Sequence, residues 1–124
     1  MDRENTVSHD DLPFDGLKVL DLSQGVAGPY CGMHLARNGA DVVKLEPPGT
    51  GCWSRQLGKA VGDQTAHSVV VHRGKRSIAA DLKSPEGLQI AKKLAADCNV
   101  MIQNYRVGKL TKFGLDYDYL VKVN

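Results

Sequence analysis

Near the start of the chain, an apolar run, a helical pattern and a second apolar run follow one another within about 30 residues, and this constrains the fold more than any other feature. The first run, 17–22, ends at a glycine-containing turn and is typical of a buried strand. Pro29 suits the first turn of a helix that ends at Asn38 and Gly39, and the β-branched run 42–45 follows. Strands joined by a helix lie parallel with a right-handed crossover. The sequence therefore predicts an α/β fold, a mostly parallel sheet with flanking helices.

The rest of the chain continues this pattern with one interruption. Residues 46–76 are glycine-rich and show one short apolar run, 68–72, so we expect a loop that binds a ligand or packs on another part of a protein. Beyond it, Ser84, Pro85 and Glu86 combine an N-cap, a first-turn proline and a favourably placed acid. The further elements expected are a strand at 77–82, a helix at 84–99, a strand at 100–102, a helical turn at 109–113 and a helix from 117.

Length and composition exclude several classes of protein. The 124 residues allow one domain, and 42% hydrophobic with 24% charged residues are values of a globular chain. The net charge of +2 is too small for a nucleic-acid-binding surface, and no apolar stretch reaches the roughly 20 residues that cross a bilayer. Residues 1–15 are polar and acidic, so we expect a flexible lead-in rather than a targeting peptide. The three cysteines form no C-x-x-C pair, which favours a reducing, cytoplasmic compartment.

Loops that follow the predicted strands carry the candidate binding residues. In open α/β sheets ligands bind beyond the carboxyl ends of the strands, so residues 23–28, 46–48 and 104–106 are expected to converge on one edge. The first loop reads G-V-A-G-P at 25–29 and leads into a helix, whose N-terminus attracts a phosphate or carboxylate. The same small residues also suit close packing of the helix on the sheet, so both interpretations stay open.

A dinucleotide site is disfavoured, although one spacing suggests it. Glu46 stands about 20 positions after Gly25, which is the offset of the ribose-binding acid in such sites. The glycines at 25, 28 and 32 do not match G-x-G-x-x-G, however, and Pro29 removes a backbone donor. We therefore do not expect NAD or FAD here.

Other chemistry-bearing residues show weaker patterns. The basic run 72–76 suits either a phosphate contact or a solvated turn. His67 and His72 lack a third ligand at metal-binding spacing, so no metal site is expected. Cys31, at the start of a helix, is interpreted as a small buried residue rather than a reactive thiol. Trp53 either covers an edge of the core or stacks on a base.

Several motifs, taken in order, resemble the start of family III CoA-transferases (CaiB/BaiF type). They are L-K-V-L-D-L-S at 17–23, A-G-P at 27–29, G-A-D-V-V-K-L-E-P-P-G at 39–49, K-R-S-I-A-A-D-L-K-S-P-E-G at 75–87, N-Y-R-V-G at 104–108 and F-G-L-D-Y at 113–117. The family includes formyl-CoA transferase, carnitine and bile-acid CoA-transferases and α-methylacyl-CoA racemase. The resemblance runs from about Leu12 to the last residue, which makes it more specific than any single motif.

This resemblance implies a Rossmann-like domain that holds coenzyme A (CoA) over the strand ends. Carried across residue by residue, the CoA contacts fall on Val26, Ala27, Ala80, Asp81, Leu82, Lys83, Asn104, Tyr105, Arg106 and Lys112. A family arginine used near the adenosine phosphate falls on Pro47, so Arg55 or Arg76 is expected to compensate.

The resemblance also implies a longer protein. Family members have a large and a smaller domain, form an interlocked homodimer, and transfer CoA between carboxylic acids through an aspartyl intermediate. By this comparison residues 16–124 are the incomplete N-terminal portion of the large domain, the nucleophile lies beyond Asn124, and this chain is inactive alone. The implied partners are an acyl-CoA and a carboxylic acid, with no metal, nucleic acid or membrane. The alternatives are an acyl-CoA racemase relative, a non-catalytic CoA- or nucleotide-binding module, and a remnant with only a folding or dimerisation role.

Overall fold

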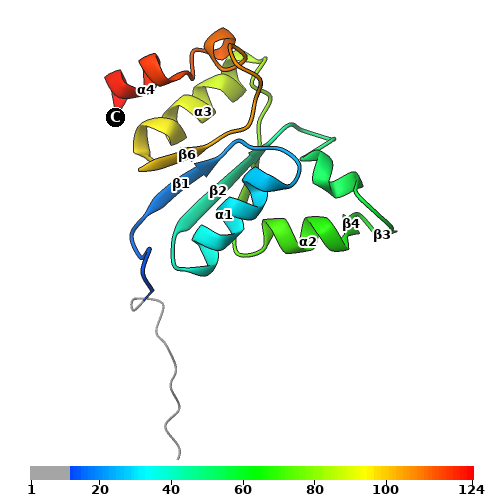
Figure 1. Ribbon diagram of the computed structural model, residues 1–124. Helices are drawn as coiled ribbons and strands as arrows, with labels where there is room; N and C mark the ends of the chain where they lie inside the picture. The colour runs from blue at the N-terminus through cyan, green and yellow to red at the C-terminus, as the bar shows by residue number, and fades with distance from the viewer. Residues whose placement is uncertain (1–11) are drawn as a thin grey trace, which may run out of the picture.

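A four-stranded parallel sheet forms the centre of the computed structural model, which describes residues 12–124 (Figure 1). Its strands are β1 (Lys18–Asp21), β2 (Asp41–Glu46), β5 (Arg76–Ala79) and β6 (Val100–Ile102), in the order β5-β2-β1-β6. Every neighbouring pair is parallel. The predicted α/β fold with a parallel sheet is therefore confirmed. Residues 1–11 of the predicted lead-in lie outside the described residues.

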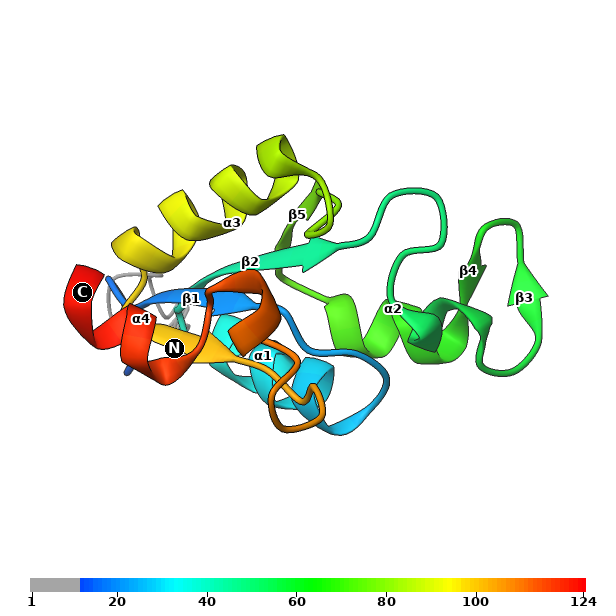
Figure 2. The same cartoon turned by 90° about the horizontal axis from the view of Figure 1, so that it is seen from above.

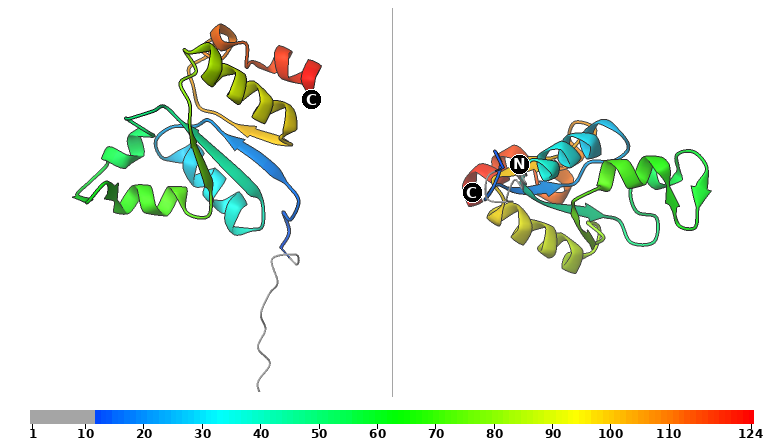
Figure 3. Two further views of the ribbon diagram at one scale, coloured as in Figure 1. Left: turned by 180° about the vertical axis from the view of Figure 1, so that it is seen from behind. Right: turned by 90° about the horizontal axis from the view of Figure 1, so that it is seen from below.

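Helices cover both faces of the sheet. Helices α1 (Ala27–Arg37) and α2 (Ala66–His72) lie on one side, and α3 (Pro85–Asp97) and α4 (Tyr117–Val123) lie on the other (Figures 1 and 3). Successive strand residues point to opposite faces, so each face has its own apolar core. Val19 and Val42 are buried on the α1 side, whereas Leu20, Leu45 and other residues pack under α3. Full burial of one such side chain contributes about 1.5–3 kcal/mol.

The helix on the second face begins where the sequence predicts it. Ser84 accepts a hydrogen bond from the Gly87 N–H at 3.0 Å, Pro85 is the first residue of α3, and Glu86 lies in its first turn. By contrast, α1 begins at Ala27, two residues before the predicted start at Pro29. Strand β5 ends at Ala79 instead of 82 because the chain turns at 81–84, where the Ser84 N–H bonds to the Asp81 carbonyl at 3.0 Å.

The segment 46–76 is more ordered than predicted. It contains the 3-10 helix η2 (Trp53–Gln56), the short hairpin β3 (Ala60–Val61) and β4 (Gln64–Thr65), and helix α2. Thr65 and Ser68 form a reciprocal capping box at the start of α2. Figure 2 shows that the hairpin projects away from the sheet beyond α2. A second 3-10 helix, η3 (Thr111–Phe113), stands where a helical turn was predicted. No helix within residues 12–124 is long and apolar enough to cross a membrane.

Candidate functional site

The carboxyl ends of the four strands bring the candidate loops together at one edge of the sheet. The loops after β1 and β6 are tied by the Asn104 side chain, whose Nδ2 donates to the Gln24 carbonyl at 2.7 Å and whose Oδ1 accepts from the Gln24 N–H at 2.8 Å. Strand β2 lies on the other side of β1, and β5 lies beyond it. The predicted convergence of the loops at 23–28, 46–48 and 104–106 is therefore confirmed. Asn104 uses both polar atoms of its amide to hold this arrangement.

The turn that leads into α1 is covered at Gly25 but exposed at Val26 and Ala27. Gly25 has a φ of +80° and is buried, and a Cβ atom there would overlap the indole of Trp53. Trp53 thus covers the turn, although half of its side chain stays exposed. Val26 and Ala27 are exposed, and no side chain caps the first N–H groups of α1. An anion that approaches Val26 and Ala27 would meet the positive end of the helix dipole.

Residues 80–83 line a small cavity of about 140 Å³ with Tyr105. Ala80 and Leu82 belong to the core, so little of either residue is exposed to a ligand. Asp81 accepts the Lys83 N–H at 2.9 Å and shapes the turn, and Lys83 itself is exposed. The remaining lining includes Pro47 and a lysine that the sequence analysis did not single out, Lys109. The sequence could have indicated Lys109 as a candidate, because it lies between two predicted contacts, Arg106 and Lys112.

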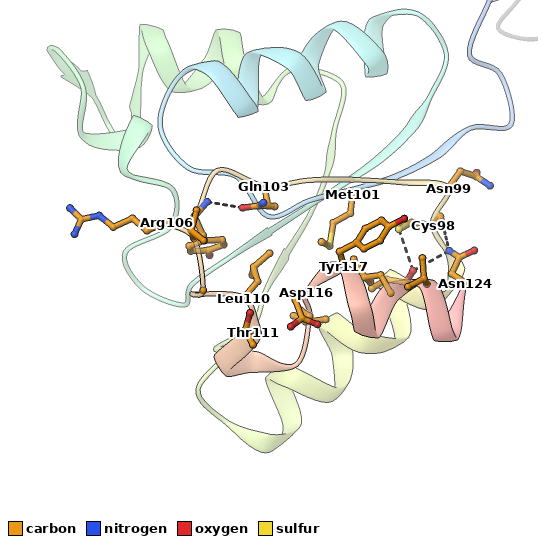
Figure 4. Close-up of a pocket in the computed structure, with 17 residues that line it drawn as sticks. Cys98, Asn99, Met101, Gln103, Arg106, Leu110, Thr111, Asp116, Tyr117 and Asn124 are labelled. Atoms are coloured by element: carbon orange, nitrogen blue, oxygen red, sulfur yellow. Dashed lines mark hydrogen bonds between the residues drawn. The ribbon is translucent and has the colours of Figure 1, made fainter.

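A larger cavity of about 590 Å³ lies between β6 and α4 (Figure 4). Its lining is largely apolar and includes Met101, Leu110 and Leu120. Arg106 belongs to its rim, and Figure 4 shows the guanidinium pointing away from the cavity. Lys112 is exposed and lines neither this cavity nor the smaller one. The structure therefore brings most of the predicted contact residues to one edge, and Lys112 lies between Thr111, which lines the larger cavity, and Phe113, which lines the smaller one.

The basic run 72–76 contains an exposed turn at Arg73 and Gly74, as one of its two interpretations predicted, but two of its cations form ion pairs within the chain. The Lys75 ammonium is buried and lies 2.7 Å from Asp21 Oδ2, and Arg76 pairs with Asp41 at 2.6 Å. Because Arg76 and Asp41 are the first residues of their strands, this pair lies at the amino ends of the sheet. The expectation that Arg76 replaces the family arginine at Pro47 is therefore wrong.

Arg55 lies at the carboxyl end of β2, but a carboxylate already holds it. Its Nε and Nη2 atoms donate to the two Glu46 oxygens at 2.8 and 2.7 Å. Burial would raise the pKa of Glu46, but hydrogen bonds from Arg55 and the Cys52 N–H outweigh it and lower that pKa to about 2. With both oxygens accepting hydrogen bonds, Glu46 is a poor ribose ligand, which agrees with the weak match to a dinucleotide site.

The half-buried side chain of His72 contacts a residue of η2. The His72 Nε2 atom lies 2.9 Å from Ser54 Oγ, and burial together with nearby lysines and Arg55 lowers the pKa of His72 to about 4. Among the described residues, no group of three or more His, Cys, Asp or Glu side chains has a metal-binding arrangement.

Cys31 is exposed, so its interpretation as a small buried residue is wrong.

Comparisons with known proteins agree on one family. Residues 14–124 match the profile of CoA-transferase family III. The chain is 44% identical over 107 residues to the succinyl-CoA:glutarate CoA-transferase of Homo sapiens, covering 86% of this chain and 24% of that protein. It is 37% identical over 121 residues to the acetyl-CoA:oxalate CoA-transferase of Acetobacter aceti, covering 98% and 31%. The crystal structure of a CAIB/BAIF family protein from Brucella suis superposes with a TM-score of 0.85 at 41% identity, over 91% of this chain and 31% of that one. The chain thus spans about a quarter to a third of the length of these relatives.

Proposed function

The chain belongs to CoA-transferase family III, and from that premise we propose that it binds the CoA part of an acyl-CoA at the carboxyl edge of its sheet. The observation that carries this proposal is the convergence of three loops. The turn with Val26 and Ala27 is tied to Asn104, and residues 80–83 share a cavity with Tyr105. CoA needs backbone N–H groups to bind its phosphates and an apolar wall for its pantetheine arm, and this edge offers both.

Each group of residues has its own proposed role. The exposed amides at Val26 and Ala27, at the N-terminus of α1, receive a phosphate oxygen of CoA. Lys83 and Arg106 are both exposed, and they supply positive charge to the phosphates of CoA. The half-buried ring of Tyr105, together with Pro47 and Phe113 of the same cavity, forms the apolar wall. Lys112 lines neither cavity, whereas Lys83 lines the smaller one, so we expect Lys112 to contribute less than Lys83.

The transfer reaction is proposed for a full-length protein. We infer that such a protein moves CoA between carboxylic acids through an aspartyl intermediate formed outside these residues, as a cytoplasmic homodimer in which residues 16–124 are part of the CoA-binding domain. Support comes from relatives named as transferases with succinyl-CoA, glutarate, acetyl-CoA and oxalate. A racemase relative would use the same CoA site, so it is separated by product analysis and not by CoA binding.

Calorimetric titration of CoA into the chain and two variants tests the proposed site. Because a charge-assisted contact contributes roughly 1.5 kcal/mol, Lys83→Ala and Arg106→Ala should each weaken binding about tenfold. The matched control is Lys18→Ala, which removes an exposed pair with Asp97 at the amino end of β1 and should leave the affinity unchanged. Unchanged affinity in both site variants would remove the assignment.

A further inference from the structure

Beneath the turn before α1 lies a buried cluster of three charged side chains, Asp21, Lys44 and Lys75. We propose that this cluster positions the segment 23–29, which comprises the turn and the first residues of α1, for CoA binding, so that Lys44 and Lys75 are positioning residues that contact no ligand. The inference rests on the proposed function, because it assigns a task to residues under the same loop.

Asp21 is the centre of the cluster. It is the last residue of β1, lies beside Lys44 in the strand register, and is fully buried. Its Oδ1 accepts hydrogen bonds from the Ser23 N–H at 2.9 Å, from the Ser23 hydroxyl, and from Lys44 Nζ at 3.2 Å. Its Oδ2 accepts from Lys75 Nζ at 2.7 Å. Burial alone would raise the pKa of Asp21, but the two lysines and these hydrogen bonds hold it below its ordinary value.

Both lysines also bond to the main chain of the segment 23–29, one at each end. Lys44 Nζ donates to the Ser23 carbonyl, and Lys75 Nζ donates to the Pro29 carbonyl at 2.6 Å. The side chains of both lysines are only 1% exposed. They come from different parts of the chain, β2 and the connection before β5, yet both end on this turn. The residues between these two anchors include Val26 and Ala27.

Glycines let the helix approach the cluster closely. A Cβ atom at Gly32 of α1 would lie 2.9 Å from both Asp21 Oδ2 and Lys75 Nζ, and one at Gly28 would overlap the Ser23 side chain. The first turn of α1 therefore packs directly on Ser23, and the second packs directly on Asp21 and Lys75. A buried ion cluster is seldom the most stable way to fill a core, because desolvation of the charges opposes their attraction. The presence of this buried ion cluster is explained if it holds the segment 23–29 in one conformation.

The test combines CoA affinity with amide hydrogen exchange in the whole chain. Lys75→Met keeps the length of the side chain but removes its charge and both hydrogen bonds. We expect exchange to accelerate in peptides covering 23–30 and not in those covering β2, and the Kd for CoA to rise about tenfold. If Lys75→Met does not fold, Lys75→Gln is measured by the same two readouts.

Two controls separate positioning from other roles. Val42→Ala truncates the core at the amino end of β2 and should lower the melting temperature without changing the Kd. Asp21→Asn combined with Lys75→Met keeps the formal charge of the cluster but not its contacts with the turn, so it should bind as weakly as the single variant. Recovery of affinity in that double variant, or faster exchange spread evenly over the sheet, would overturn the inference. So would an unchanged Kd in Lys75→Met, whereas a wild-type chain that binds no CoA would instead overturn the proposed function.

Discussion

At the scale of single residues, the site depends on side chains that meet across long stretches of sequence. The strand pattern predicted that the loops 23–28 and 104–106 converge, and the family resemblance assigned CoA contacts to Val26, Ala27 and Asn104 within them. It did not predict that Lys44 is buried, since one lysine in an apolar strand is ordinarily interpreted as facing solvent. Nor did it predict the contact of Lys75 with Asp21, 54 positions earlier. Such pairings depend on how the strands and helices pack, which local patterns do not encode.

Gly25 is expected to be sensitive to any side chain. Its φ of +80° already disfavours an L-residue, and the indole of Trp53 occupies the place of a Cβ atom. Gly25→Ala should therefore lower the free energy of unfolding by about 2–4 kcal/mol in urea titrations. Gly49→Ala is the control, because Gly49 has a φ of +74° but open space around it, and should cost only about 1–2 kcal/mol. Equal losses in the two variants would mean that Trp53 does not constrain the turn.

His72 predicts a pH dependence of stability. Its pKa is about 4 in the folded chain and about 6.5 in an unfolded one, so the unfolded state takes up a proton first as the pH falls. The free energy of unfolding should thus decrease between pH 6.5 and 4, and His72→Gln should flatten the curve over that window. Glu46 acts lower, between about pH 4.5 and 2, where its protonation removes the stability that Arg55 provides. Parallel curves for wild type and His72→Gln between pH 6.5 and 4 would contradict this account.

At the scale of elements, those with strong local signals were predicted and those without were not. The cap, proline and acid at 84–86 predicted α3, and the β-branched run at 42–45 predicted β2. Helix α2 was not predicted from the sequence, because it has only seven residues and leaves Val69 and Val70 exposed. Its sequence therefore shows no amphipathic period. The hairpin β3–β4 has two residues in each strand, which is too short for an alternating pattern.

The N-cap of α3 should have a measurable energetic effect. Because the Ser84 hydroxyl accepts the Gly87 N–H at 3.0 Å, Ser84→Ala should lower the free energy of unfolding by about 1 kcal/mol. Ser77→Ala, on an exposed position of β5, serves as the control and should change it by less than about 0.5 kcal/mol. Chemical denaturation of both variants measures the difference. If they unfold at the same denaturant concentration, the capping bond contributes nothing.

At the scale of the whole molecule, apolar surface remains exposed at the β6 edge of the sheet. Within residues 12–124, strand β6 pairs only with β1, and the cavity of about 590 Å³ beside it is bordered by exposed Tyr117 and Val121. The relatives are three to four times longer than the matched region, so their remaining residues have no counterpart among those described here. At the proposed CoA-binding edge, by contrast, hydrogen bonds between Gln24 and Asn104 join the loops after β1 and β6 within the described residues.

A nitrogen-15 NMR titration of this 13.5 kDa chain with CoA measures most directly whether that edge is the binding site. The predicted result is that the shifted amide signals cluster in residues 23–28, 80–83 and 103–106 and leave the amino ends of the strands, at Lys18 and Asp41, unchanged. Shifts centred on those amino ends, or no shifts at millimolar CoA, would contradict the claim that the carboxyl edge binds CoA.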